Sequence, residues 1–284
     1  MSDTCQKCGS TIHYSQRRCA VCNTEAGFPN ILACQRREEA EALLQRYDDA
    51  RTSAGARGAL TQLDAFEGAV ASNSKAVMNR NLGALSNWLN GASELFLTFY
   101  NQMRYLGRVP SDNEWDSQRA AAEAAINPFC YEDLNFSALS LDGTGMHYYG
   151  PYTVTLKSVT IEDRASVFEI NPFYFNKKHQ IVAGRAPPCG YRAPWDVRAQ
   201  LAVAKLHRQI APNTVATEFP NILMEPRRGE SDCDFIEVHI FGPVNRLGIE
   251  RIVGPAPTDR ADRNIWRQAK RKARDFGADV EEVA

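Results

Sequence analysis

The stretch Phe235-Ile-Glu-Val-His-Ile-Phe241 is the clearest β-strand that the sequence predicts. Apart from Glu237 and His239 it contains only β-branched and aromatic residues, which favour strands. Because side chains alternate between the two faces of a strand, Glu237 shares a face with Phe235 and His239. A carboxylate in an apolar strand needs a partner or a function, because burying an unpaired charge is costly. The alternative is an ordinary glutamate on a half-exposed sheet.

Further strands and helices are predicted around this stretch. Residues 152–157 alternate polar and apolar side chains, and strands are also expected at residues 165–170, 215–219, 222–224 and 247–253. Helices are expected at residues 195–210 and 259–276. Residues 171–194 contain four prolines and predict a long irregular segment. Strands mixed with a few helices indicate an α+β fold.

The N-terminal half of the chain has helical periodicity. Leucine, methionine and aromatic residues recur three and four places apart, and such stripes usually pack in a core. The predicted helices span residues 38–51, 60–70, 74–89, 92–106 and 114–126. The sequence therefore predicts three parts: a cysteine-rich module at residues 1–28, a small helical region at residues 29–130, and an α+β domain at residues 131–284.

Two cysteine pairs, Cys5-Gln-Lys-Cys8 and Cys19-Ala-Val-Cys22, lie within the first 22 residues. Four thiolates in two CxxC pairs can surround Zn²⁺ tetrahedrally, which stabilises a segment too short to form a hydrophobic core. Gly9 follows the first pair, where a chain that wraps a metal-bound sulfur favours a positive φ. The sequence thus predicts a four-cysteine zinc ribbon or knuckle, with disulfides or a redox dithiol as the alternative. The other four cysteines are expected to be buried or free thiols.

The overall composition is that of an ordinary globular protein, with 44% hydrophobic and 24% charged residues. A net charge of −1 gives no general attraction to nucleic acids or membranes. No apolar run reaches the roughly 18 residues of a membrane helix, and no signal segment is recognisable. With reduced zinc ligands, these features favour a cytoplasmic protein without a membrane partner, although secretion without a cleaved signal is the alternative.

Several common catalytic motifs are absent from the sequence. It contains no phosphate-binding GxxxxGK[ST] loop, no GxGxxG fingerprint, no GxSxG elbow and no HExxH helix. The segment Pro188-Cys189-Gly190 lacks the second cysteine that a zinc deaminase requires.

Residues 137–256 resemble a known family. The segments that carry the resemblance are YGPYTVTLKS from Tyr149, EDRASVFE from Glu162, DFIEVHIFGPV from Asp234 and IERIV from Ile249. Together they resemble the ADP-ribosyltransferases of the bacterial toxin-like type. In that family a first strand carries a His or Arg that holds NAD, a second carries a Ser/Thr-rich motif, and a later strand carries the catalytic glutamate.

The resemblance implies a split β-sheet domain in which Glu237 is the catalytic carboxylate. It implies that His147 holds the NAD ribose, that Tyr149 stacks on the nicotinamide, and that Arg164 meets the pyrophosphate. Ser166 would bind the nicotinamide ribose or orient Glu237. A carboxylate beside the ribose would stabilise the positive charge that develops as the nicotinamide–ribose bond breaks. Each of these residues also has an ordinary structural role as its alternative.

The implied activity is transfer of ADP-ribose from NAD to a macromolecule, either protein or nucleic acid. Position 235 is Phe, where arginine-modifying members have an acidic or amide residue, which disfavours arginine as the acceptor. The resemblance implies a toxin, a toxin–antitoxin component or an antiphage defence effector, and hence an antitoxin or immunity protein that could act on the helical region.

The alternative function is a non-enzymatic zinc-ribbon module that binds RNA or a partner protein. The predicted helix at residues 259–276 carries seven Lys and Arg residues, which can follow nucleic-acid phosphates or form a solvated face.

Overall fold

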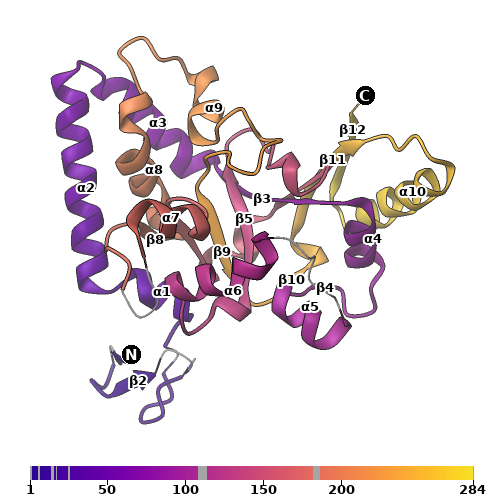
Figure 1. The fold of residues 1–284 in the computed structure, drawn as a ribbon, viewed down its shortest axis with the longest axis horizontal. Coiled ribbons are helices and arrows are strands. Elements are labelled where there is room, and N and C mark those ends of the chain that lie inside the picture. The colour runs from indigo at the N-terminus through magenta and orange to yellow at the C-terminus, as the bar shows by residue number, and fades with distance from the viewer. Residues whose placement is uncertain are drawn as a thin grey trace.

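The computed structural model describes the chain except residues 1, 6, 14–15, 17, 25, 108–113, 182–185 and 284. Its centre is an eight-stranded sheet with the order β12-β11-β6-β3-β5-β9-β7-β8 (Figure 1). Neighbouring strands are antiparallel except β11 and β12, which are parallel. The strands are β3 Lys75–Arg80, β5 Leu134–Ser140, β6 Tyr152–Leu156, β7 Ala165–Phe168, β8 Arg192–Pro194, β9 Glu237–Phe241, β11 Ile249–Pro255 and β12 Asp279–Val283.

The helices are distributed along the whole chain. They are α1 Pro29–Cys34, α2 Arg37–Ala56, α3 Leu60–Asn73, α4 Leu82–Asn90, α5 Phe99–Leu106, α6 Glu114–Ile126, α7 Pro172–His179, α8 Arg198–Leu206, α9 Phe219–Leu223 and α10 Arg260–Asp275. Two small sheets complete the fold. One pairs β1 Ser2–Thr4 with β2 Thr11–His13, and the other pairs β4 Leu95–Phe96 with β10 Val244–Asn245.

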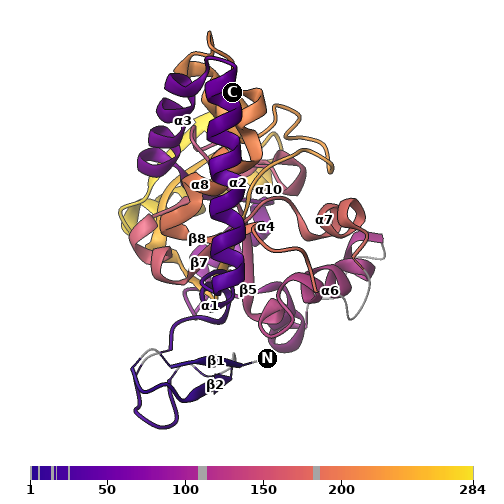
Figure 2. The same ribbon diagram turned by 90° about the vertical axis from the view of Figure 1, so that its left-hand side faces the viewer.

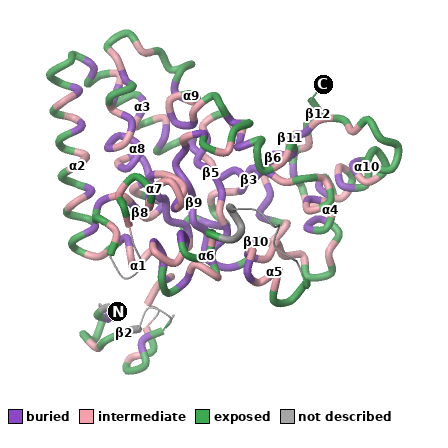
Figure 3. Tube along the Cα trace, viewed as in Figure 1, coloured by how far each residue is buried: buried purple, intermediate pink, exposed green. Residues whose placement is uncertain are grey.

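One face of the large sheet carries the main hydrophobic core. Apolar side chains of seven strands, among them Met78, Val154 and Val238, are almost completely buried there. Residues of α2, α3, α4, α8 and α10 belong to the same core, so these helices close that face (Figure 2; Figure 3). Burial of this continuous apolar surface supplies the main driving force for folding.

The opposite face of the sheet is more polar. In the register of β9 with β7, Phe168 lies opposite Glu237 and Ser166 opposite His239, so these four side chains share that face. Three small hydrophobic clusters cover it in place of one core. One of them joins α6 to α7 through Ile126 and Phe175. The face therefore has room for polar groups between its clusters.

The structure confirms the α+β fold class, and most of the predicted elements are present. The predicted strands correspond to β6, β7, β9 and β11, and the predicted helices to α2, α3, α6, α8 and α10. The irregular segment at residues 171–194 is wrong in part, because it contains α7 and β8; residues 182–185 lie outside the described part of the chain. The expected strand at 215–219 is wrong, since residues 216–218 form a short 3₁₀ turn and α9 begins at Phe219. The one at 222–224 is wrong except at Met224, which pairs with Phe235 in an isolated β-bridge.

Two of the predicted helices need correction. Residues 74–89 divide into strand β3 and helix α4, which begins where Asn81 Oδ1 accepts a hydrogen bond from Ala84 N at 2.8 Å. β3 is central and buried on both faces, so its apolar run lacks the alternation of a half-exposed strand. Residues 92–106 are helical only from Phe99, after the short strand β4.

The stretches 29–130 and 131–284 share the sheet and its core. β3 pairs with β5 and β6, and α2 and α3 contact α8. The predicted division near residue 130 stays a prediction.

Within the described residues, no helix combines the length and apolar character needed to cross a membrane.

Gly150 fixes the approach of the 3₁₀ turn His147–Tyr149 to the end of β3. Its φ of +140° suits glycine, and a Cβ there would overlap the backbone carbonyl of Arg80. We expect Gly150→Ala to lower the free energy of unfolding by roughly 2–4 kcal/mol. Gly68→Ala in α3 is the control: no atom lies within 4 Å of its Cβ, so it should add about 0.5–1 kcal/mol. Urea denaturation measures both, and equal stabilities would contradict the close approach.

Candidate functional site

A cavity of about 1280 Å³ opens on the polar face of the sheet. Strands β3, β5 and β9 line it from the sheet, and α4, α5, α6, the start of α7 and the turn His147–Tyr149 line it from the other sides. The polar residues that line it include Asn79, Arg80, Arg119, Glu123, Tyr149, Asn171 and Glu237. Such a volume exceeds the usual range for drug-sized ligands and suits a larger molecule.

Glu237 lies at the first position of β9 and is 5% exposed. Both of its carboxylate oxygens have hydrogen-bond partners. His239 Nε2 lies 3.0 Å from Oε2, and Asn171 Nδ2 donates to Oε1 at 3.3 Å. The prediction that Glu237 and His239 share a face is confirmed, and the two donors fix the orientation of the carboxylate toward the cavity.

A second hydrogen bond continues from His239 to α6. Asn127 Nδ2 donates to His239 Nδ1 at 3.1 Å, which leaves the ring proton on Nε2, where it faces Glu237. His239 is 2% exposed and Asn127 6%. Phe136 meets the edge of the imidazole ring and Phe168 stacks on it. The ring therefore cannot turn without losing both hydrogen bonds in a site closed to water.

Glu123 is a second buried carboxylate that lines the cavity. Its Oε2 accepts a hydrogen bond from the Tyr100 hydroxyl at 2.9 Å, and its Oε1 forms an ion pair with Arg119 at 3.0 Å. Burial raises the pKa of the Glu123 carboxyl to about 7, and the negative charge of Glu237 adds to the rise against the effects of Arg119 and Tyr100. The cavity thus contains two buried carboxylates, and the pKa of one of them, Glu123, is raised to about 7.

The predicted site residues do not all meet at this cavity. Tyr149 lines it together with Glu237, and its pKa is raised by burial of the phenol and then by the charge of Glu237, although 43% of the residue is exposed. His147 begins the same turn but is exposed and does not line the cavity. The roles assigned to these two residues stay predictions.

Ser166 and Arg164 lie beside β9 but outside the cavity lining. Ser166 is opposite His239, and its hydroxyl accepts a hydrogen bond from Asn30 Nδ2 at 3.0 Å. Arg164 donates to the carbonyl oxygens of Phe241 and Pro243, past the far end of β9 from Glu237. Their predicted roles stay untested. In the structure Arg164 binds the end of β9, and Ser166 binds Asn30.

Three polar residues, two in α6 and one directly after it, were not predicted as part of the site. Arg119, Glu123 and Asn127 follow one another at four-residue intervals, at the side of α6 that faces Glu237 and His239. The only signal in the sequence is this polar series within an alanine-rich helix. Arg80, whose guanidinium lies over the ring of Phe96 at 4.5 Å, also lines the cavity at the end of β3.

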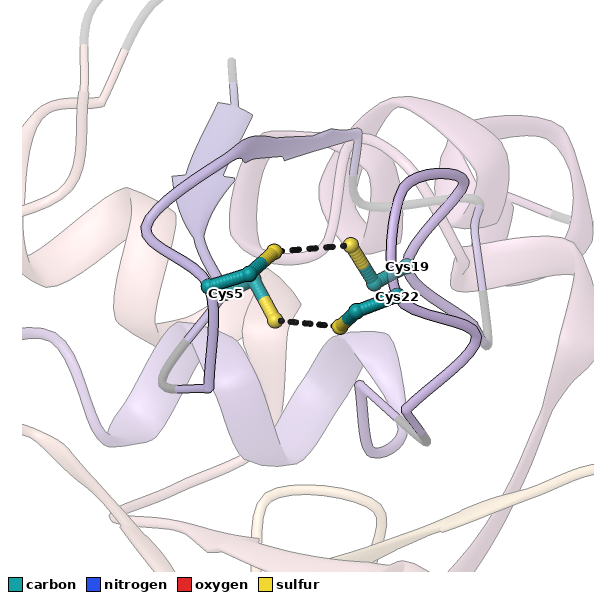
Figure 4. A group of neighbouring side chains, drawn as sticks. Cys5, Cys19 and Cys22 are labelled. Atoms are coloured by element: carbon teal, nitrogen blue, oxygen red, sulfur yellow. Dashed lines mark hydrogen bonds between the residues drawn. The ribbon is translucent and has the colours of Figure 1, made fainter.

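The four N-terminal cysteines form a separate candidate metal centre (Figure 4). Their sulfur atoms all lie within 4.8 Å of one another, with 3.6 Å between Cys5 and Cys22 and 3.5 Å between Cys8 and Cys19. Zn–S bonds of about 2.3 Å give a tetrahedron whose sulfur–sulfur edges are about 3.8 Å. The cluster can therefore hold a metal ion such as zinc.

The two cysteine turns have the same backbone geometry. Gly9 N donates to Cys5 O at 2.8 Å, and Asn23 N donates to Cys19 O at 2.9 Å. Gly9 has φ +71°, as the sequence predicts, and Asn23 has φ +56° at the matching position of the second turn. Asparagine tolerates this region better than most residues, so each turn can wrap its sulfur atoms. The four thiols are free, and their sulfur atoms are too far apart for the roughly 2.05 Å bond of a disulfide.

The other four cysteines are free, as expected, with Cys34, Cys130 and Cys233 buried and Cys189 exposed.

No model of a known protein family matches the chain, and no curated protein matches it significantly. The candidate sites therefore rest on the residues and their geometry.

The pKa of Glu123 predicts a specific dependence of stability on pH. Because folding raises this pKa from 4.5 to about 7, the unfolded state ionises first and stability falls as the pH rises between these values. Replacement by Gln removes this loss, on the order of 3 kcal/mol. We expect the free energy of unfolding of Glu123→Gln, relative to wild type, to rise from pH 4.5 to pH 8. Glu250→Gln, at a more exposed carboxylate, is the control; parallel pH profiles for all three proteins would contradict the assignment.

Metal content tests the cysteine cluster. Purified wild-type protein should contain about one zinc ion per chain by elemental mass spectrometry, and Cys8→Ser should lose most of it because one ligand of four is removed. Cys189→Ser, an exposed cysteine outside the cluster, should keep the metal. Metal-free wild-type protein with oxidised N-terminal cysteines would contradict the metal centre.

Proposed function

We propose that the chain is an ADP-ribosyltransferase that transfers ADP-ribose from NAD to a macromolecular acceptor, with Glu237 as its catalytic carboxylate. The observation that carries the proposal is the buried carboxylate of Glu237, held by two donors at the wall of a large cavity. The resemblance of residues 137–256 to toxin-like ADP-ribosyltransferases supports the same assignment, because it selects the same glutamate independently of the cavity.

The proposed reaction exchanges one bond at C1′ of the ribose for another. The C1′–N bond breaks, the nicotinamide leaves with the electron pair, and positive charge develops on the ribose ring. Glu237 stabilises that charge, since its orientation is fixed before the reaction by His239 and Asn171. An oxygen or nitrogen of the acceptor then attacks C1′ and releases its proton.

We assign the acceptance of that proton to Glu123. It lines the same cavity, and a pKa of about 7 is near the optimum for a general base at neutral pH. Arg119 and Tyr100 hold its two oxygens, so its position is defined. In the proposed reaction Glu237 thus stabilises the positive charge, and Glu123, in different surroundings, accepts the proton.

The basic residue that holds NAD is a further part of the proposal. In the family that the sequence resembles, a first strand carries a His or Arg for this purpose. β3 is the first strand of the large sheet, and it ends at Arg80, which lines the cavity. We therefore assign this role to Arg80 rather than to the exposed His147.

We also propose a metal, a cellular compartment and a controlling partner for the enzyme. The cysteine cluster is a zinc ribbon that orders the N-terminal module, and the chain acts in the cytoplasm as a toxin or antiphage effector. Uncontrolled transfer of ADP-ribose would harm the cell that makes it, so an antitoxin or immunity protein belongs to the system. A non-enzymatic binding module is the competing function, and the cysteine cluster and the basic helix α10 are the features that favour it.

Transfer of label from NAD tests the proposal. Wild-type protein, incubated with ³²P-labelled NAD and cell lysate, should transfer label to a macromolecule, and Glu237→Gln should reduce the transfer at least 100-fold because the charge beside the ribose is lost. Glu250→Gln, at a half-exposed glutamate of β11 that pairs with Lys75 outside the cavity, is the matched control and should retain activity. Protease and nuclease digestions identify the acceptor class. Equal labelling by Glu237→Gln, or none by folded, metal-loaded wild type, would reject the proposal.

A further inference from the structure

Five arginines form one stripe along α10. Arg260, Arg263, Arg267, Arg271 and Arg274 follow one another at intervals of three and four residues and are all exposed. In an α-helix such intervals place side chains on one side. The helix lies at the outer end of the sheet, next to β11 and β12 (Figure 1).

None of these five arginines forms an ion pair with the described residues. The neighbouring strand β12 carries three carboxylates. Glu281 pairs with Arg251 and Glu282 pairs with Lys270 at 2.5 Å, and Asp279 is in no ion pair with a described residue. Arg267 donates only to the amide oxygen of Asn264, at 3.2 Å. The acidic residues of the helix itself, Asp262 and Asp275, also remain outside any ion pair with the stripe. The stripe thus concentrates positive charge on a chain whose net charge is −1.

The opposite side of α10 is closed by the protein. Trp266, Ala269 and Ala273 are buried in the main core, and Trp266 packs against the ring of Tyr152 at 4.8 Å. An amphipathic helix that binds a lipid surface must insert its apolar side. Here that side is occupied, so the exposed stripe is suited to a charged partner in solution rather than to a membrane.

The type of basic residue in the stripe indicates which kind of anion it binds. All five members of the stripe are arginines, while the two lysines of α10 point elsewhere: Lys270 binds Glu282, and Lys272 lies over the ring of Phe276. Guanidinium groups bind phosphate oxygens with paired hydrogen bonds, which ammonium groups cannot do. From Arg260 to Arg274 the helix rises about 21 Å, and about six base-pair steps of a duplex span the same length.

We propose that the arginine stripe of α10 binds the phosphodiester backbone of a nucleic acid. Contacts to phosphates position a protein without reading sequence, so binding by the stripe is independent of sequence. The binding itself does not depend on catalysis. Only its extension, that a nucleic acid is the acceptor of ADP-ribose, rests on the proposed function.

Fluorescence anisotropy without NAD tests the stripe separately from any transfer. The full chain is titrated into fluorescein-labelled 24-nucleotide duplex DNA, single-stranded DNA and hairpin RNA at 50–300 mM NaCl. The variant is Arg263→Gln/Arg267→Gln/Arg271→Gln, which keeps helix propensity. The control is Arg37→Gln/Arg104→Gln/Arg208→Gln, which removes the same charge from exposed arginines outside α10.

We expect wild type and control to bind at least one of the three nucleic acids with strong salt dependence. The α10 variant should bind at least 10-fold more weakly at 50 mM NaCl, and the slope of log Kd against log salt should become shallower by roughly two to three, about 0.9 per lost phosphate contact on a duplex. The three nucleic acids identify which form is preferred.

Three outcomes would overturn the inference. They are no binding by folded wild type, an equal loss of affinity in the control triple variant, or binding of wild type to polyglutamate or anionic vesicles as tight as to nucleic acid. Circular dichroism of both triple variants shows that the fold is kept. Loss of transfer with retained nucleic-acid binding would reject the proposed enzyme but leave the stripe intact.

Discussion

The buried chain of hydrogen bonds from Asn127 through His239 to Glu237 joins the end of α6 to strand β9 in the candidate site. Glu237 and His239 are two residues apart on β9, so both must face the same side of the sheet. Without partners in this closed position, each would lose the free energy of its hydration. Asn127 completes the chain and fixes the end of α6 against the sheet. Helix α6 also carries Glu123. The position of the Glu123 carboxylate therefore depends on the hydrogen bonds that join α6 to Glu237.

The two faces of the sheet differ in how they are packed. One face is covered by a continuous apolar core that supplies stability, and the other is divided among small clusters with polar groups between them. Packing on the first face allows the second to keep a cavity of about 1280 Å³ and several buried polar side chains. Gly150 allows the turn that carries Tyr149 to lie close to β3, and Asn79 Nδ2 donates to the Gly150 carbonyl at 3.0 Å. The N-terminal cysteine cluster and the arginine stripe lie outside this arrangement.

The sequence predicted the parts of the fold whose patterns are local. Strand β9, helix α10 and the cysteine turns each have a complete signal within a few residues, and Glu237 was found because a carboxylate in an apolar strand is unusual. β3 was missed because a strand buried on both faces has no alternation and α4 follows it after one residue. Asn127 was missed because its partner His239 is more than 110 residues away. Glu123 was missed because it meets the strands of the cavity only in the folded chain. In an isolated helix the same residues would be an ordinary solvated series, and only the packing of α6 on the sheet makes them part of a site.

The most direct measurement of the central claim is a crystal structure of the protein soaked with NAD or a non-hydrolysable analogue. The account predicts that the dinucleotide occupies the cavity beside Glu237, with a ribose hydroxyl within hydrogen-bond distance of the Glu237 carboxylate, about 2.6–3.2 Å. A second cavity of about 980 Å³ lies between α6, α7 and the segment around Cys189. NAD bound there, or a cavity beside Glu237 that stays empty at saturating NAD, would contradict the assignment of Glu237 as the catalytic carboxylate.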